Sequence, residues 1–133
     1  MSRFTNFDNV EVEGNVLTKT TVTTKATAAA VTFTADEVLG GLILRDPAGA
    51  NRADLLPTAA ALINAMDYPE TGASFEFTIR NTADLAETIT VTTNTGLTLS
   101  GTMTIAQNNS KRFLAVVTSA TAITVYSLGT IVH

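Results

Sequence analysis

Cysteine and tryptophan are absent from this chain of 133 residues, and its single histidine is the final residue, His133. Without cysteine, neither a disulfide nor a thiolate-bound metal can hold the fold together. A metal site built from three histidines is excluded by composition as well. Because most chain ends are poorly ordered, we interpret His133 as a solvated terminal residue. We therefore expect no metal site and no other cofactor.

Charged residues are also scarce, at 15% of the chain compared with about 25% in an ordinary domain. The 8 lysines and arginines are outnumbered by 12 aspartates and glutamates, and the only adjacent basic pair is Lys111-Arg112. Nucleic-acid-binding domains normally carry a clustered basic stripe, so we expect no nucleic-acid partner. The chain has no run of about 18 apolar residues and no apolar signal segment at its start, so we expect no membrane partner.

Short alternating segments take the place of charge and of long apolar runs. From residue 73 onward one short strand-like segment follows another, and Phe75, Phe77 and Ile79 alternate with polar neighbours. This period of two is typical of half-buried antiparallel strands. Threonine, a good strand former, makes up roughly one residue in five. The pattern predicts an all-β fold: a jelly-roll or other Greek-key β-sandwich or barrel of about eight strands, with one short α-helix.

Two parts of the chain differ in their pattern. Residues 1–15 have no regular period and predict an extended N-terminal arm, whereas residues 16–133 predict a single β-domain. We expect the helix at about residues 57–67, where Pro57 suits a first turn and Gly72 follows the apolar stripe. The predicted core consists of Val31, Phe33, Leu42, Leu44, Leu62, Ile63, Phe75, Phe77, Ile79, Ile89, Val91, Phe113, Ile123 and Val125.

No catalytic constellation is recognisable among the polar residues. The serines lie in predicted strands or turns, and no internal histidine exists to activate one of them. Glu76 and Glu87 could in principle form the carboxylate pair of a glycosidase, but we expect both at solvent-facing strand positions. We therefore predict that the chain has no catalytic residue and is not an enzyme.

One loop holds a dense group of charges. Arg45, Asp46, Arg52 and Asp54 lie close together in the sequence. Carboxylates can bind a hard cation, but the loop lacks the alternating carboxylate pattern of a calcium loop. The neighbouring arginines also neutralise the charge that a cation would need. We predict that Arg45 and Arg52 pair with Asp46 or Asp54 and stiffen the loop.

Three groups of turn and core residues resemble a known family. They are the junction Arg45–Asp54–Leu56-Pro57-Thr58-Ala59, the strand Phe75–Phe77–Ile79–Arg80-Asn81 and the hairpin Asn108-Asn109-Ser110-Lys111-Arg112-Phe113. With these motifs, residues 40–132 resemble the capsid decoration (cement) proteins of tailed bacteriophages, notably the cyanophage-like ones. The resemblance implies a β-barrel or jelly-roll subunit that forms a homotrimer on the outside of an icosahedral head.

The resemblance also implies a function. A protein of this family is a structural component of the virion that binds the head surface and stabilises it by bridging capsid subunits. The implied partners are the major capsid protein and further copies of the chain itself. The implied location is the capsid surface, after synthesis in the host cytoplasm. In the predicted arm, Phe4, Phe7 and Val10 are spaced by three and would serve as capsid anchors beside Arg3, the only basic residue of the arm.

Two other classes of function remain open. A trimeric head-fibre or tail-fibre module that binds a receptor or glycan would share the threonine-rich β-pattern, but no coiled coil or shaft repeat precedes the predicted domain. A small hydrolase is the more remote alternative, because it needs a polar catalytic cluster. We rank the decoration protein first, the fibre-type module second and the hydrolase third.

Overall fold

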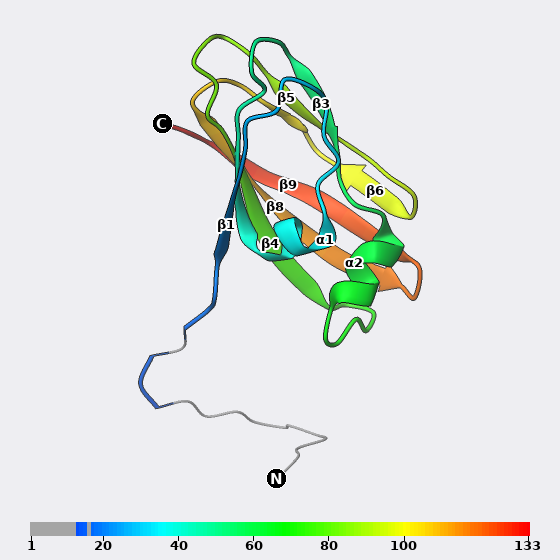
Figure 1. Ribbon diagram of the computed structural model, residues 1–133. Helices are drawn as coiled ribbons and strands as arrows, with labels where there is room; N and C mark the ends of the chain where they lie inside the picture. The colour runs from blue at the N-terminus through cyan, green and yellow to red at the C-terminus, as the bar shows by residue number, and fades with distance from the viewer. Residues whose placement is uncertain (1–12, 16) are drawn as a thin grey trace.

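The computed structural model describes residues 13–15 and 17–133, which form two facing β-sheets and two short helices (Figure 1). The larger sheet has the order β1 (Thr21–Lys25), β2 (Gly41–Arg45), β4 (Ser74–Asn81), β8 (Asn109–Ser119), β9 (Ala122–Val132) and β6 (Leu97–Ser100). The smaller sheet has the order β3 (Arg52–Leu55), β5 (Ile89–Thr92) and β7 (Thr104–Ile105). The described chain is therefore mostly β, as its alternating pattern predicts.

The hydrogen bonding of both sheets is mixed. β1 pairs with β2, β2 with β4, β6 with β9 and β3 with β5 in parallel. The pairs β4–β8, β8–β9 and β5–β7 are antiparallel. The prediction of antiparallel strands is therefore wrong for the parallel pairs. Alternation along a strand reports which of its faces is buried, and it carries no information on the direction of the neighbouring strand.

The described residues contain a second helix in addition to the predicted one. Helix α2 (Ala59–Ala65) lies within the predicted range of residues 57–67. Thr58 caps it, because the Thr58 side chain accepts a hydrogen bond from the Ala61 amide at 3.1 Å. Neither helix of the described chain is long and apolar enough to cross a membrane.

Helix α1 (Ala35–Leu39) is the helix that the sequence analysis does not predict. Its start is a capping box in which the Thr34 hydroxyl accepts from the Glu37 amide at 3.2 Å and a Glu37 carboxylate oxygen accepts from the Thr34 amide at 3.1 Å. Lys25 of β1 adds an ion pair to Glu37 at 2.9 Å. A Thr-x-x-Glu spacing is the sequence signal of such a cap, and it was missed because the helix has little more than one turn.

The hydrophobic core lies between the two sheets and includes side chains of both helices. Phe77 of β4 and Phe113 of β8 stack there with ring centroids 5.0 Å apart. Every second residue of the central strands points into this core, which is why the alternating pattern locates most of it. Its buried side chains are those of Phe33, Val38, Ile43, Leu56, Ala59, Leu62, Phe77, Ile79, Ile89, Val91, Leu97, Ile105, Phe113, Ala115, Val117, Ile123 and Val125.

The predicted orientation of β2 is wrong. Ile43 and Arg45 face the interior and are fully buried, whereas Leu42 and Leu44 lie on the opposite face and are only half-buried. Three successive apolar residues offer no polar alternation from which the inner face could be chosen. Three other predicted core residues pack at the margin of the core, namely Val31, Ile63 and Phe75.

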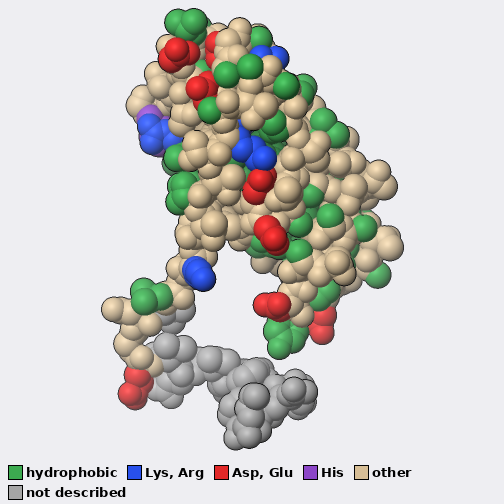
Figure 2. Space-filling view, viewed as in Figure 1, with side chains coloured by type: hydrophobic (Ala, Val, Ile, Leu, Met, Phe, Trp, Pro, Cys, Tyr) green, Lys and Arg blue, Asp and Glu red, His purple; other side chains and the backbone are tan. Residues whose placement is uncertain are grey.

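The described chain before β1 extends away from the two sheets (Figure 1). Residues 13–15 and 17–20 are exposed, and Leu17 is 88% exposed. The remainder of the predicted arm, residues 1–12, lies outside the described residues. In the space-filling view, charged side chains are scattered over the visible face and form no broad patch of one sign (Figure 2).

Candidate functional site

The larger sheet has an inner face toward the core and an outer face on the opposite side. Buried side chains of α1, α2 and the smaller sheet all join the core on the inner face. In the part of the chain that the structure describes, no element therefore covers the outer face. Strand register places a partly apolar set of side chains there: Val22, Leu42, Leu44, Leu114, Val116, Tyr126 and Ile131.

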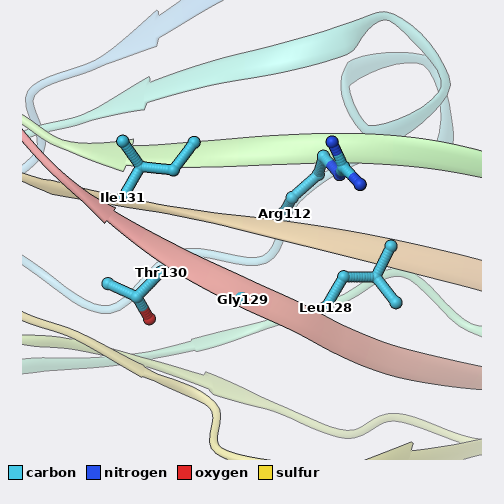
Figure 3. Close-up of a pocket in the computed structure, with 5 residues that line it drawn as sticks. All are labelled: Arg112, Leu128, Gly129, Thr130 and Ile131. Atoms are coloured by element: carbon cyan, nitrogen blue, oxygen red, sulfur yellow. The ribbon is translucent and has the colours of Figure 1, made fainter.

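A hollow of about 150 Å³ lies on the outer face where β8 meets β9. Gly129 forms its floor, because a glycine leaves no side chain opposite Arg112 in the register of the two strands. A register irregularity beside Arg112 brings Leu128 next to this gap. Arg112, Leu128 and Ile131 project from the same side of the sheet, whereas Thr130 points to the other side (Figure 3). The hollow therefore has apolar walls and one guanidinium at its edge.

The charges on the outer face near the hollow are mainly positive. Register places Arg80 directly opposite Ser110 and Thr78 opposite Arg112. The Arg112 Nε lies 3.8 Å from a carboxylate oxygen of Glu76, and both side chains are about half exposed. An exposed ion pair at this distance contributes little stability. Arg80 and Arg112 therefore remain accessible to a negatively charged group.

His133 is not free of contacts, contrary to the sequence interpretation. Its Nε2 lies 2.8 Å from the Ser110 hydroxyl, and its backbone amide donates to the Asn108 carbonyl at 2.8 Å. A serine beside a histidine resembles part of a catalytic triad. Ser110 is only 4% exposed, however, and no carboxylate orients His133 within the described residues. The contact therefore fastens the C-terminal end of β9 to β8.

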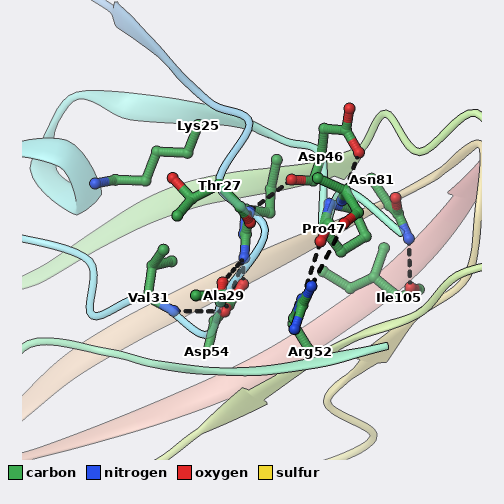
Figure 4. A network of polar contacts seen from close by, with 12 residues as sticks. Lys25, Thr27, Ala29, Val31, Asp46, Pro47, Arg52, Asp54, Asn81 and Ile105 are labelled. Atoms are coloured by element: carbon green, nitrogen blue, oxygen red, sulfur yellow. Dashed lines mark hydrogen bonds and ion pairs between the residues drawn. The ribbon is translucent and has the colours of Figure 1, made fainter. Parts of the chain in front are cut away.

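The densest polar contacts lie inside the molecule, between β2 and β3. The Arg45 Nε donates to an Asp54 carboxylate oxygen at 2.7 Å, and both side chains are fully buried. The other guanidinium nitrogens donate to the carbonyls of Thr27, Asp46 and Ala29 at 2.6 to 2.9 Å. Asp54 also accepts from the Val31 amide at 2.9 Å. This pair connects the two sheets and the segment between β1 and α1. Figure 4 labels its partners Thr27, Ala29, Asp46 and Asp54.

The other two members of the predicted ion-pair group make different contacts. Arg52 donates to the carbonyls of Pro47 and Ala48 at 2.9 and 3.4 Å, and it pairs with neither Asp46 nor Asp54. Asp46 accepts from the Ala48 amide at 2.8 Å and closes a local turn. The carboxylates of this loop are thus engaged in structural contacts, and a cation has no set of oxygens left to bind.

Two further buried polar residues lie at the end of the core near β7. The Asn81 amide nitrogen donates to the carbonyls of Glu87 and Ile105 at 2.8 and 3.0 Å, and its oxygen accepts from the Ala83 amide at 3.0 Å. Glu87 is only 6% exposed, and one of its carboxylate oxygens has no partner. The prediction that Glu87 faces solvent is therefore wrong, because the residue lies in the turn before β5 and is folded inward. Glu76, in contrast, is exposed as predicted.

Lys111 is the remaining buried charge of the described chain. It lies on the inner face of β8, is 4% exposed, and its Nζ donates to the Thr102 carbonyl at 2.9 Å. Burial disfavours the charged ammonium and lowers the pKa of Lys111. No carboxylate pairs with it among the described residues.

The described residues contain no cluster of three histidine, cysteine, aspartate or glutamate side chains that could hold a metal ion. No protein-family model, no curated protein and no solved structure matches this chain. The feature that stands out for function is therefore a surface. The outer face combines exposed apolar side chains, a hollow and accessible guanidinium groups, a composition suited to contact with another macromolecule.

Proposed function

We propose that this chain is a structural virion protein, a capsid decoration (cement) protein that binds the outer surface of a phage head. The observation that carries this proposal is the outer face of the larger sheet, which is broad, weakly charged and uncovered in the described residues. An exposed face of this kind favours a protein that binds another macromolecule over a protein that performs catalysis. The resemblance of residues 40–132 to decoration proteins supports the head as the place of binding.

We propose that the protein acts as a homotrimer whose partner is the major capsid protein. Leu128, Ile131 and Val132 are 44%, 55% and 77% exposed, and exposed apolar side chains close together support burial against a further chain. The number three comes from the resemblance. The proposed location is the capsid surface of the virion, with synthesis in the host cytoplasm.

Within this proposal the subunit is a two-layer β-sandwich related to the jelly-roll or barrel subunits that the resemblance implies. A jelly roll is built from antiparallel strands, whereas β2 here lies parallel to both of its neighbours. We therefore propose a sandwich with mixed strand directions.

We further propose that residues 2–14 and one end of the β-domain make the bridge between capsid subunits. Phe4, Phe7 and Val10 would anchor this arm, and Arg3 is its only basic residue, so binding should depend weakly on salt. Arg3, Phe4, Phe7 and Val10 lie outside the described part of the chain. The described segment that follows them extends away from the sheets, which supports a role in reaching a neighbouring molecule.

Binding to heads tests this function. Heads assembled from the major capsid protein proposed as the partner are mixed with the full chain or with a variant lacking residues 1–14, and bound protein is measured by co-sedimentation. We expect saturable binding of the full chain and much weaker binding of the shortened variant, which should still fold and form trimers. Absence of binding by the full chain would contradict the function, whereas equal binding of both would contradict only the role of the arm.

A fibre-type module that binds a receptor or glycan is the second candidate. Tyr126 is 41% exposed on the outer face, and an exposed aromatic ring can stack on a sugar. Binding of the isolated protein to a glycan array, lost on Tyr126→Ala, would favour this candidate over the decoration protein.

A further inference from the structure

The turn between α2 and β4 carries an exposed aromatic side chain between two carboxylates. Tyr68 is 84% exposed, and Asp67 and Glu70 on either side of it are exposed as well. Backbone hydrogen bonds hold the turn, because the Glu70 amide donates to the Tyr68 carbonyl and the Ala73 amide donates to the Glu70 carbonyl, both at 2.9 Å. At the lower end of the domain, Figure 2 shows hydrophobic side chains beside acidic ones. The turn thus presents an exposed aromatic side chain flanked by two carboxylates.

The hollow on the outer face complements the turn, because it offers apolar walls for an aromatic ring and positive charge for the carboxylates. Its walls are the apolar side chains of Leu128 and Ile131, and its floor is Gly129. Arg112 lies at its edge, and Arg80 lies on the next strand, β4. A tyrosine that enters the hollow would bury its ring between the apolar walls, while flanking carboxylates would meet the guanidinium groups.

The two features cannot meet within one copy of the chain. The turn lies at the end of the domain where β4 begins, and the end of β9 lies near the other end (Figure 1). In the register of the sheet, Arg112 pairs with Thr78, which is four residues beyond the first residue of β4. At about 3.3 Å per residue this is a separation of roughly 13 Å along the strand, to which the turn itself adds. A turn that enters the hollow therefore comes from a second copy.

We infer that the Asp67-Tyr68-Pro69-Glu70 turn of one copy docks into the Gly129 hollow of a second copy. Such a contact joins two different surfaces, so each copy offers a turn to one neighbour and a hollow to the other. Repeated around a symmetry axis, the contact closes a ring, and three copies would make the proposed trimer. The contact forms between copies in solution and holds whether or not the chain decorates a head.

Cross-linking tests this contact cleanly, because the chain has no cysteine of its own. One variant carries Thr71→Cys beside the turn and Thr78→Cys beside the hollow, where register places Thr78 opposite Arg112. Both changes leave Tyr68, the two carboxylates and the apolar walls of the hollow in place. A matched control carries Ala86→Cys, in another exposed loop, together with Thr78→Cys. After treatment with a short bismaleimide, we expect species of two and three chains from the first variant and monomers from the control. Monomers from both variants, or equal cross-linking of both, would overturn the inference.

Three substitutions connect the cross-link to the proposed contacts. Adding Tyr68→Ala should lower the cross-linked fraction and weaken self-association at least about tenfold, since buried tyrosines often dominate an interface. Arg112→Glu should have a similar effect, and Asp67→Arg in the same chain should restore much of the association. Cross-linking that is unchanged by Tyr68→Ala would contradict the inference. Loss of head binding with intact cross-linking would instead count against the decoration function alone.

Discussion

Arg45 is a fully buried residue whose partners come from four separate positions in the chain. Its guanidinium pairs with Asp54 and donates to the carbonyls of Thr27, Ala29 and Asp46. Placing a charge in the interior is costly, and that cost is offset only while all of these contacts are made. A substitution that removes one of these partners should therefore destabilise the fold.

Asp54→Asn should destabilise the protein strongly. The substitution keeps the shape of the side chain but leaves the Arg45 guanidinium buried without a counter-charge, which typically costs about 3 kcal/mol or more. The free energy of unfolding, measured by urea denaturation, should fall by this amount. Asp46→Asn is the matched control, because the Asp46 side chain accepts only a local turn hydrogen bond that an amide oxygen can also accept. Equal effects of the two substitutions would contradict a special role of the buried pair.

Glu87→Gln should have the opposite effect. The carboxylate is 6% exposed and one of its oxygens has no partner, so its burial opposes folding. Removing the charge should raise the free energy of unfolding by about 1 kcal/mol at neutral pH. The same change at the exposed Glu76 should leave stability nearly unaltered. A destabilised Glu87→Gln variant would show that the carboxylate has a favourable partner.

Lys111 should make stability depend on alkaline pH. Its folded pKa is lowered by burial from the ordinary value of 10.5, so the unfolded chain holds its proton to higher pH than the folded chain does. Between the two pKa values, stability therefore increases as pH rises, because the folded state no longer buries an ammonium group. We expect this increase in the wild type and not in Lys111→Met, and urea denaturation across the alkaline range measures the difference. Parallel pH profiles of the two proteins would contradict it.

At the scale of elements, local signals in the sequence locate most of the strands and the turns. Alternation in β4 correctly assigns Phe77 and Ile79 to the core. Gly96 and Asn108 are of residue types that accept positive φ in turns, and their φ values are 82° and 60°. These features depend on near neighbours in the chain, and a single sequence contains that information.

Features that depend on distant partners could not be predicted in the same way. The contact between Ser110 and His133 spans 23 positions, and the hydrogen bond between Asn81 and Ile105 spans 24. The buried position of Glu87 and the hollow at Gly129 also follow from strand order, which periodicity does not encode. The candidate surface could therefore be recognised only after the strands were placed beside one another.

The capping box of α1 provides a prediction for one element. Thr34→Ala removes the hydroxyl that accepts from the Glu37 amide, and the loss of such a cap typically costs about 1 kcal/mol. Thr34→Ser keeps the hydroxyl and should keep most of the stability. Urea denaturation of both variants measures the difference. A Thr34→Ala variant as stable as Thr34→Ser would mean that the core, rather than the cap, holds α1 in place.

At the scale of the whole molecule, the described residues form two facing β-sheets, and none of the described elements covers the outer face of the larger sheet. The buried ion pair joins the two layers, and the core residues of both sheets and both helices form one cluster. Most of the polar side chains on the outer face are uncharged. Under the proposed decoration function, many copies on one shell would stabilise the assembled state by mass action, because the protein would bind only that state.

Release of DNA from heads on heating tests the proposed decoration function most directly. DNA-filled heads that lack this protein are heated with a DNA-binding dye, in the presence of increasing amounts of the purified chain. We predict that the temperature of DNA release rises with added protein and reaches a plateau when the binding sites on the shell are full. An unchanged release temperature at saturating protein would contradict a role in stabilising the capsid.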